Sequence, residues 1–86
     1  MRSAYDIIIK PFVTEKSMLQ IEKGNTIWFI VHENATREEV KKAVEEISGM
    51  KVAKVNILRD KEGKKAIVKI SKDFSAEELA TKLGIF

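Results

Sequence analysis

A cluster of basic side chains is the part of this sequence best suited to chemistry. Residues 51–72 carry eight Lys or Arg residues and two acids, a net charge of +6, so the rest of the chain sums to −3 to give +3 overall. Cations gathered on one small element attract phosphate groups, as in proteins that bind a nucleic-acid backbone. Lysines also keep sheet edges from pairing with other chains, so a solvated edge is the alternative that charge alone leaves open.

Residues for catalysis or metal binding are scarce. His32 is the one histidine and there is no cysteine, so the chain lacks the usual partners of a metal site or an activated nucleophile. Each of the four glycines stands where an element is expected to end, and none suits a phosphate-binding loop. Arg59 and Asn56 could be given the phosphate-binding roles of an acylphosphatase-like hydrolase, but their spacing does not favour it. We expect no enzyme, cofactor or metal.

Capping residues and the spacing of apolar residues predict three helices, which must help to position the basic side chains. Thr14 suits the N-cap of a helix of about ten residues that Gly24 ends. Residues 36–47 combine a capping box with apolar residues at i, i+3, i+4 and i+7, and residues 75–83 begin with a second box. The residues expected to face inward are Ser17, Met18, Ile21, Val40, Ala43, Val44, Ile47, Leu79 and Leu83.

Four strands are predicted around these helices. Residues 7–9 form an apolar run before Pro11, and residues 25–32 are apolar on both faces, which is typical of a central strand covered on both sides. Residues 52–59 and 64–71 indicate a hairpin whose second strand has one buried and one largely polar face. The order β-α-β-α-β-β-α predicts an α+β fold: a four-stranded antiparallel or mixed sheet with helices packed on it, in a ferredoxin-like split β-α-β arrangement.

Four segments together resemble one known family. They are Pro11-Phe-Val-Thr14-Glu15-Lys16, the pair Asn25-Thr26 about ten residues later, Lys54-Val55-Asn56, and Gly63-Lys64-Lys65-Ala66. Through these segments, residues 5–86 are similar to the large-subunit ribosomal protein family twenty-three, the universal protein of the tunnel exit. The short loop at residues 60–63, the lack of a long basic N-terminal extension and an ending like the eukaryotic C-terminal helix resemble archaeal members.

The resemblance implies a single rRNA-binding ribosomal domain over residues 1–86. Such a protein binds large-subunit rRNA beside the polypeptide exit tunnel and helps to dock factors that meet nascent chains. The expected partners are neighbouring ribosomal proteins, the signal recognition particle and the protein-conducting channel, with no segment inserted into a membrane and with cytoplasmic ribosomes as the location. The alternative is a free-standing ferredoxin-like module that binds a ligand or regulates, which would not need so basic a hairpin.

Proteins contact folded RNA mainly at phosphates and 2′-hydroxyl groups, so Lys, Arg, Asn and Thr are the residue types expected at the interface. Thr14 has helix capping as its alternative role, and Trp28 is expected in the core rather than against a base. Glu15 resembles the family's factor-docking glutamate, with a favourable helix-start acid as the alternative. The residues expected to bind RNA are Lys10, Thr14, Lys16, Asn25, Thr26, Lys54, Asn56, Arg59, Lys64, Lys65 and Lys69.

Overall fold

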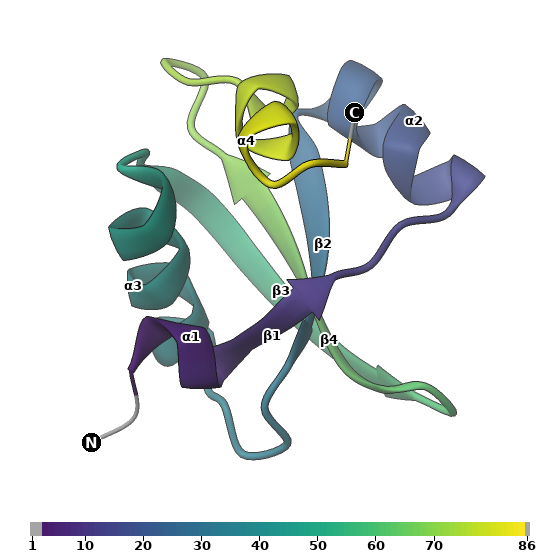
Figure 1. Cartoon of the computed structure of the whole chain (residues 1–86), viewed down its shortest axis with the longest axis vertical. Helices are drawn as coiled ribbons and strands as arrows, with labels where there is room; N and C mark the ends of the chain where they lie inside the picture. The colour runs from purple at the N-terminus through teal and green to yellow at the C-terminus, as the bar shows by residue number, and fades with distance from the viewer. Residues whose placement is uncertain (1–2, 86) are drawn as a thin grey trace.

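The computed structural model describes residues 3–85, and this part of the chain alternates helices and strands around one sheet (Figure 1). The expected order of elements is confirmed, with one short helix added at the start. The elements are α1 (Ala4–Ile7), β1 (Ile8–Pro11), α2 (Glu15–Gly24), β2 (Thr26–Val31), α3 (Arg37–Ser48), β3 (Val52–Asp60), β4 (Gly63–Ile70) and α4 (Ala76–Lys82).

The sheet has the order β1-β2-β4-β3, and every neighbouring pair is antiparallel. The last strand, β4, therefore lies between β2 and β3, which α3 connects. This is the split β-α-β arrangement, and it confirms the expected α+β class. The hairpin turn consists of residues 61–62, because Asp60 and Gly63 still pair across the two strands.

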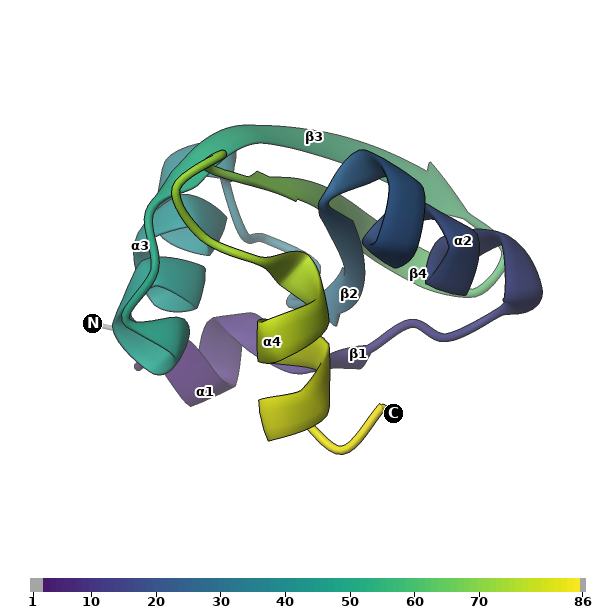
Figure 2. The same ribbon diagram turned by 90° about the horizontal axis from the view of Figure 1, so that it is seen from above.

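One face of the sheet forms the core with α1, α3 and α4, and Ile21 of α2 belongs to the same cluster of buried residues. Ile27, Phe29 and Val31 of β2 are 1–3% exposed and belong to one cluster with buried residues of these helices. Figure 2 shows α1, α3 and α4 on one side of the sheet, and α2 lies beside β2, where it also contacts α4. The strand β2 is an inner strand, as expected, but Trp28 and Ile30 on its other face are only partly buried, so the predicted cover on both sides is incomplete.

Local hydrogen bonds explain the helix boundaries. Thr14 and Ser17 form a reciprocal capping box on α2, Thr36 and Glu39 form the expected one on α3, and Gly49 ends α3 with φ of 72°. At α4, Ser75 accepts the Glu78 N–H. In the described part of the chain, the Ser75 N–H does not donate to the Glu78 carboxylate in return, so the second predicted box is only half formed.

One prediction about an inward-facing residue and one about a strand boundary need correction. Ser17 and Ile21 are the buried residues of α2, whereas Met18 is only partly buried. The predicted strand at 7–9 begins one residue later, because Ile7 belongs to α1. That helix is held by a capping box between Ser3 and Asp6 and has a single turn, too short to show a helical apolar period.

Candidate nucleic-acid interface

Cross-strand pairing places several of the predicted residues in rows on the sheet face opposite the core. Lys69 of β4 lies between Thr26 of β2 and Lys54 of β3, and Ile67 lies between Trp28 and Asn56. Directly paired residues point to the same face of a sheet. We call this side the outer face; its members are Lys10, Thr26, Trp28, Ile30, Lys54, Asn56, Leu58, Lys65, Ile67 and Lys69.

Lys54 and Lys69 are the most available cations of the outer face. Both are exposed, and within residues 3–85 neither has a hydrogen-bond or ion-pair partner. They are direct cross-strand partners, an arrangement of like charges that destabilises a sheet. A phosphate held between the two ammonium groups would relieve this repulsion. Exposed Asn56 lies one row further along β3 and adds a hydrogen-bonding group to the same face.

The N-terminal segment contributes two more exposed cations. Lys10 of β1 pairs with Ile30 on the outer face, and Lys16 lies in the first turn of α2. Thr14 lies between them in the chain, as the N-cap of α2, and its hydroxyl oxygen accepts the Ser17 N–H at 3.1 Å. The capping role considered for Thr14 is therefore made in the structure.

Arg59 and Lys64 lie on the opposite face of the hairpin from Lys54 and Lys69. They pair with each other across the strands, near the turn, and both contact the loop after β2. The Arg59 guanidinium forms an ion pair with the Glu33 carboxylate, and Lys64 Nζ donates to the Glu33 carbonyl oxygen at 3.3 Å. The positive charge of the hairpin is thus divided between two surfaces, although it is continuous in sequence.

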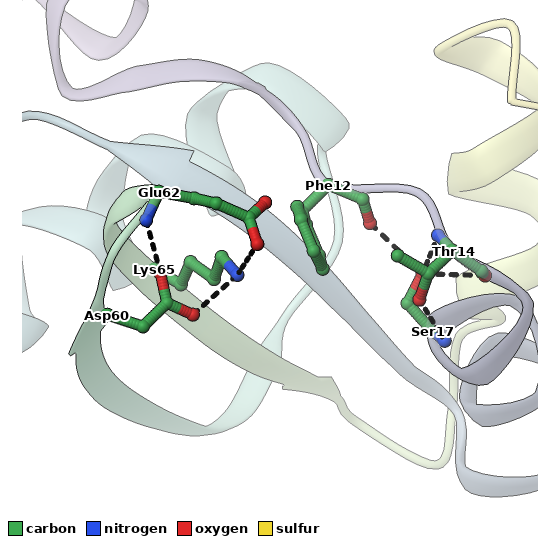
Figure 3. A network of polar contacts seen from close by, with 6 residues as sticks. All are labelled: Phe12, Thr14, Ser17, Asp60, Glu62 and Lys65. Carbon is green, nitrogen blue, oxygen red and sulfur yellow. Dashed lines mark hydrogen bonds and ion pairs between the residues drawn. The ribbon is translucent and has the colours of Figure 1, made fainter.

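Lys65 is buried, which the strand pattern did not predict. It is 3% exposed, and its Nζ lies 2.6 Å from Asp60 Oδ2 and 3.6 Å from Glu62 Oε1 (Figure 3). The same atom lies 3.7 Å above the centre of the Phe12 ring, a cation–π contact. The expected largely polar face of β4 is therefore wrong at this position, because two acids and an aromatic ring enclose the ammonium.

The Lys65 pairing shifts the acid–base properties of both partners. The hydrogen bond to Asp60 raises the pKa of the Lys65 ammonium above its ordinary value, against the opposing effect of desolvation. The same bond, followed by the Glu62 N–H that donates to Asp60 Oδ1 at 2.9 Å, lowers the pKa of the Asp60 carboxyl. Lys65 is fully charged at neutral pH, and its charge is already engaged within the protein.

The side chains of Asn25 and Thr26 form hydrogen bonds with backbone groups of the protein itself. Asn25 has left-handed backbone angles at the end of α2, and its Nδ2 donates to the carbonyl oxygens of Ile70 and Phe74 at 3.0 and 3.1 Å. Its Oδ1 accepts the Ala76 N–H at 2.7 Å. The Thr26 hydroxyl donates to the Gly24 carbonyl oxygen at 2.8 Å. Of these two side chains predicted to bind RNA, Asn25 therefore joins the end of α2 to β4 and α4, and Thr26 joins the start of β2 to the end of α2.

Trp28 lies on the outer face and not in the core, so its predicted position was wrong. Its Nε1 donates to Gln20 Oε1 of α2 at 2.6 Å, and its ring stacks on Phe12 with centroids 5.9 Å apart. Sequence reasoning missed Phe12 and Gln20. The apolar alternation of residues 27–31 already put Trp28 on the face away from Phe29, and this signal could have indicated an aromatic site there.

The exposed side of α2 has a different character from the outer face. Glu15 is exposed at the first helical position, and Glu22 lies exposed two turns later. Leu19, between them, is 51% exposed. This acidic and apolar surface suits a basic protein segment better than RNA, because an unpaired carboxylate repels phosphate.

Neither a metal site nor a membrane-spanning helix is present in residues 3–85. No group of three or more His, Cys, Asp or Glu side chains there could hold a metal ion. His32 lies at the end of β2, where its Nδ1 accepts the Asn34 N–H at 3.0 Å. A helix long and apolar enough to cross a membrane does not occur in this described range.

Comparison with known proteins gives consistent matches along the chain. Residues 6–77 match the family model described as Ribosomal protein L23. The chain is 54% identical over 81 residues to the large ribosomal subunit protein uL23 of Picrophilus torridus, covering 94% of this chain and 99% of the relative. The uL23 proteins of Thermoplasma acidophilum and Methanothermobacter thermautotrophicus are 51% and 43% identical, with 94% and 95% of this chain and 96% of each relative covered.

Proposed function

This chain belongs to the ribosomal protein L23 family, and on that premise we propose that it binds large-subunit rRNA through the outer face of its sheet. It is a component of the large ribosomal subunit and not an enzyme, and its location is the cytoplasmic ribosome. The expected resemblance is confirmed, and the three relatives named above come from archaea. Family membership also removes the free-standing regulatory module as an alternative.

The pairing of Lys54 with Lys69 is the observation that carries the rRNA proposal. Two exposed ammonium groups directly opposite each other, without a protein anion in residues 3–85, form a local excess of positive charge. RNA phosphates supply the missing anions, and release of their counterions favours binding. Asn56 can donate to phosphate or 2′-hydroxyl oxygens beside them. Lys10 and Lys16 extend the proposed contact toward α2.

The remaining predicted residues divide into two groups. Arg59 and Lys64 are proposed to meet a second stretch of RNA at the hairpin tip, since they lie on the other side of the hairpin. Lys65, Asn25, Thr14 and Thr26 are engaged inside the protein, so we propose that they act on RNA binding through the fold.

The rRNA proposal is tested by the salt dependence of binding to archaeal large-subunit rRNA. With about five phosphates neutralised, log K should fall against log salt with a slope of roughly −3 to −5. The double variant Lys54→Gln/Lys69→Gln should flatten that slope by about one to two units. Lys41→Gln/Lys42→Gln removes the same charge from the exposed side of α3 and should leave the slope unchanged. An affinity independent of salt, or equal effects of the two double variants, would contradict the proposal.

We further propose that the protein lies beside the polypeptide exit tunnel and that Glu15 helps to dock nascent-chain factors. The support is the resemblance of Glu15 to the family's docking residue, together with its exposure next to Leu19 and Glu22. The expected visitors are the signal recognition particle and, second, the protein-conducting channel. Rim charges of this kind mainly set the rate of encounter and its sensitivity to salt.

The docking proposal is tested with purified ribosomes that carry Glu15→Lys. Assembly into large subunits should be unchanged, whereas the signal recognition particle should associate more slowly, most clearly at low salt. Glu38→Lys is the matched control, because Glu38 is also an exposed acid in the first turn of a helix. Equal on-rates for ribosomes with Glu15→Lys, Glu38→Lys and the unchanged protein would return Glu15 to the role of a helix-start acid.

A further inference from the structure

The tip of the β3–β4 hairpin extends beyond the rest of the sheet. Pairing between β2 and β4 ends at Ile30 and Lys65, whereas β3 and β4 continue to pair as far as Asp60 and Gly63. Residues 59–64 therefore form a two-stranded ribbon, and an isolated ribbon of this kind is marginally stable in water. In Figure 1 the end of this hairpin projects from the body of the molecule.

Two sets of contacts tie this ribbon to the body. On one side, Glu33 contacts Arg59 and Lys64, but the ion pair with Arg59 is well exposed, and exposed pairs contribute little. On the other side, Lys65 is almost fully enclosed by Asp60, Glu62 and the ring of Phe12 (Figure 3). Phe12 is fixed in turn by its stacking on Trp28 and by the hydrogen bond from its N–H to the Trp28 carbonyl oxygen.

We propose that Lys65 is a positioning residue for RNA binding, which it supports by fixing the hairpin tip against the Phe12 segment rather than by contacting phosphate. The Lys65 ammonium joins both acids near the turn to the loop between β1 and α2. With the tip fixed, the exposed cations of the hairpin keep one arrangement toward the RNA. This inference rests on the rRNA binding proposed above and assigns a role within it.

Moving Lys65 onto a phosphate would break the contacts that hold it within the protein. Its ammonium would leave both carboxylates, and one of them, Asp60, also fixes the turn by accepting the Glu62 N–H. The Lys65 side chain is only 4% exposed, so it would have to leave an enclosed position and its place above the Phe12 ring to reach RNA. Lys54 and Lys69 on the same two strands are exposed and need no such rearrangement. The two acids of the basic segment therefore act in favour of RNA binding, although their charge opposes it.

The decisive variant is Asp60→Asn, because the two explanations predict opposite signs. Removal of an acid beside a phosphate-binding surface should tighten RNA binding if only charge matters. If Asp60 holds Lys65 and the tip in place, the same change should weaken binding to archaeal large-subunit rRNA by about three- to tenfold. The salt slope should remain unchanged, because no phosphate contact is lost.

Three further measurements separate positioning from general destabilisation. Asp73→Asn removes the same charge from the exposed connection between β4 and α4, and it should leave binding unchanged or slightly tighter. Lys65→Arg should retain most of the affinity, since a guanidinium can bind both carboxylates. Trp28 is the only tryptophan, so its fluorescence should shift in Asp60→Asn as Phe12 loses the ammonium above its ring.

Each result has a defined meaning when binding is compared at a temperature where all variants are folded. Weaker binding by Asp60→Asn with an unchanged salt slope and a shifted Trp28 emission supports the positioning role. Equal or tighter binding by Asp60→Asn, while the unchanged protein binds with the expected salt slope, overturns the inference alone. If the unchanged protein shows no salt-dependent binding, the rRNA proposal fails and the inference falls with it.

Discussion

The two ends of the β3–β4 hairpin carry similar numbers of cations and use them differently. At the base, Lys54 and Lys69 face each other on the outer face without a partner among residues 3–85. At the tip, Arg59 and Lys65 are paired with acids, and Lys64 donates to a backbone carbonyl. The cations at the base are therefore available to a ligand, whereas most of those at the tip form contacts that stabilise the tip itself. A net charge counted along the sequence does not distinguish the two.

The largest expected effect is on folding stability, and it separates the two asparagines predicted to bind RNA: one is hydrogen-bonded within the fold and the other is exposed. Asn25→Ala removes the side-chain hydrogen bonds to Ile70, Ser71, Phe74 and Ala76 and a residue suited to left-handed backbone angles, and it should lower the free energy of unfolding by about 2–4 kcal/mol. The Asn56 side chain is exposed, so Asn56→Ala should change the free energy of unfolding by less than ~0.5 kcal/mol while weakening rRNA binding. Urea unfolding followed by Trp28 fluorescence measures both. Equal losses of stability would mean that Asn56 also has a structural partner.

On α3, a charged residue that forms a hydrogen bond within the protein, Glu45, can be compared with an exposed one, Lys41. Glu45 Oε2 accepts the Val52 N–H at 3.0 Å, which fixes the start of β3. Glu45→Ala should destabilise the protein by about 1 kcal/mol, while Lys41→Ala, on the exposed side, should change stability by less than ~0.5 kcal/mol. The measurement is the midpoint of chemical denaturation. A costlier Lys41→Ala would show that exposure is a poor guide on this helix.

Removing the ion-pair partner of Arg59 should make this cation of the tip available to RNA, as Lys54 and Lys69 are at the base. Glu33→Gln removes the ion-pair partner of Arg59 and should raise rRNA affinity by about two- to threefold, with a salt slope steeper by up to about one unit. Glu77→Gln, an exposed acid on α4, is the control and should have a smaller effect. Weaker binding by Glu33→Gln would instead indicate that this ion pair, like that of Lys65, positions the tip.

The smallest effect concerns acid pH. The pKa of Asp60 is lowered in the folded protein by Lys65 and the Glu62 N–H, so its ionised form stabilises the fold. This contribution is fully present above the ordinary carboxyl pKa of about 3.9 and is lost as the pH falls through the lower folded value. The stability difference between the unchanged protein and Asp60→Asn should therefore vanish in acid. A difference that stays constant from pH ~6 to pH ~2 would show that another effect of the substitution dominates.

Much of the fold could be predicted because its signals are local. Capping residues such as Thr14 and Thr36 and the glycine after α3 mark helix ends within a few residues, and the hairpin is marked by its short turn. The helix α1 escaped prediction because a single turn has no period. The split β-α-β arrangement was expected and is confirmed, but the place of β1 beside β2 had no signal in the sequence.

The candidate site was predictable where alternation along a strand is decisive. Lys54, Asn56 and Lys69 follow from the strand pattern, and so does their common face. The burial of Lys65 does not, because it depends on Phe12, a residue distant in sequence that only the folded chain brings near. The structural role of Asn25 had a local signal that was not used: an asparagine after a helix often takes left-handed backbone angles.

The contacts of Asn25 also set an order of events while the protein is being made. A ribosome releases residue 25 long before residue 76, which lies 51 positions later and supplies the N–H that Asn25 Oδ1 accepts. Ala76, Leu79 and Ala80 are fully buried members of the core, so until they emerge the growing chain leaves part of β2 uncovered. Native packing around β2 is therefore completed only after all four strands have been synthesised, when α4 closes over them.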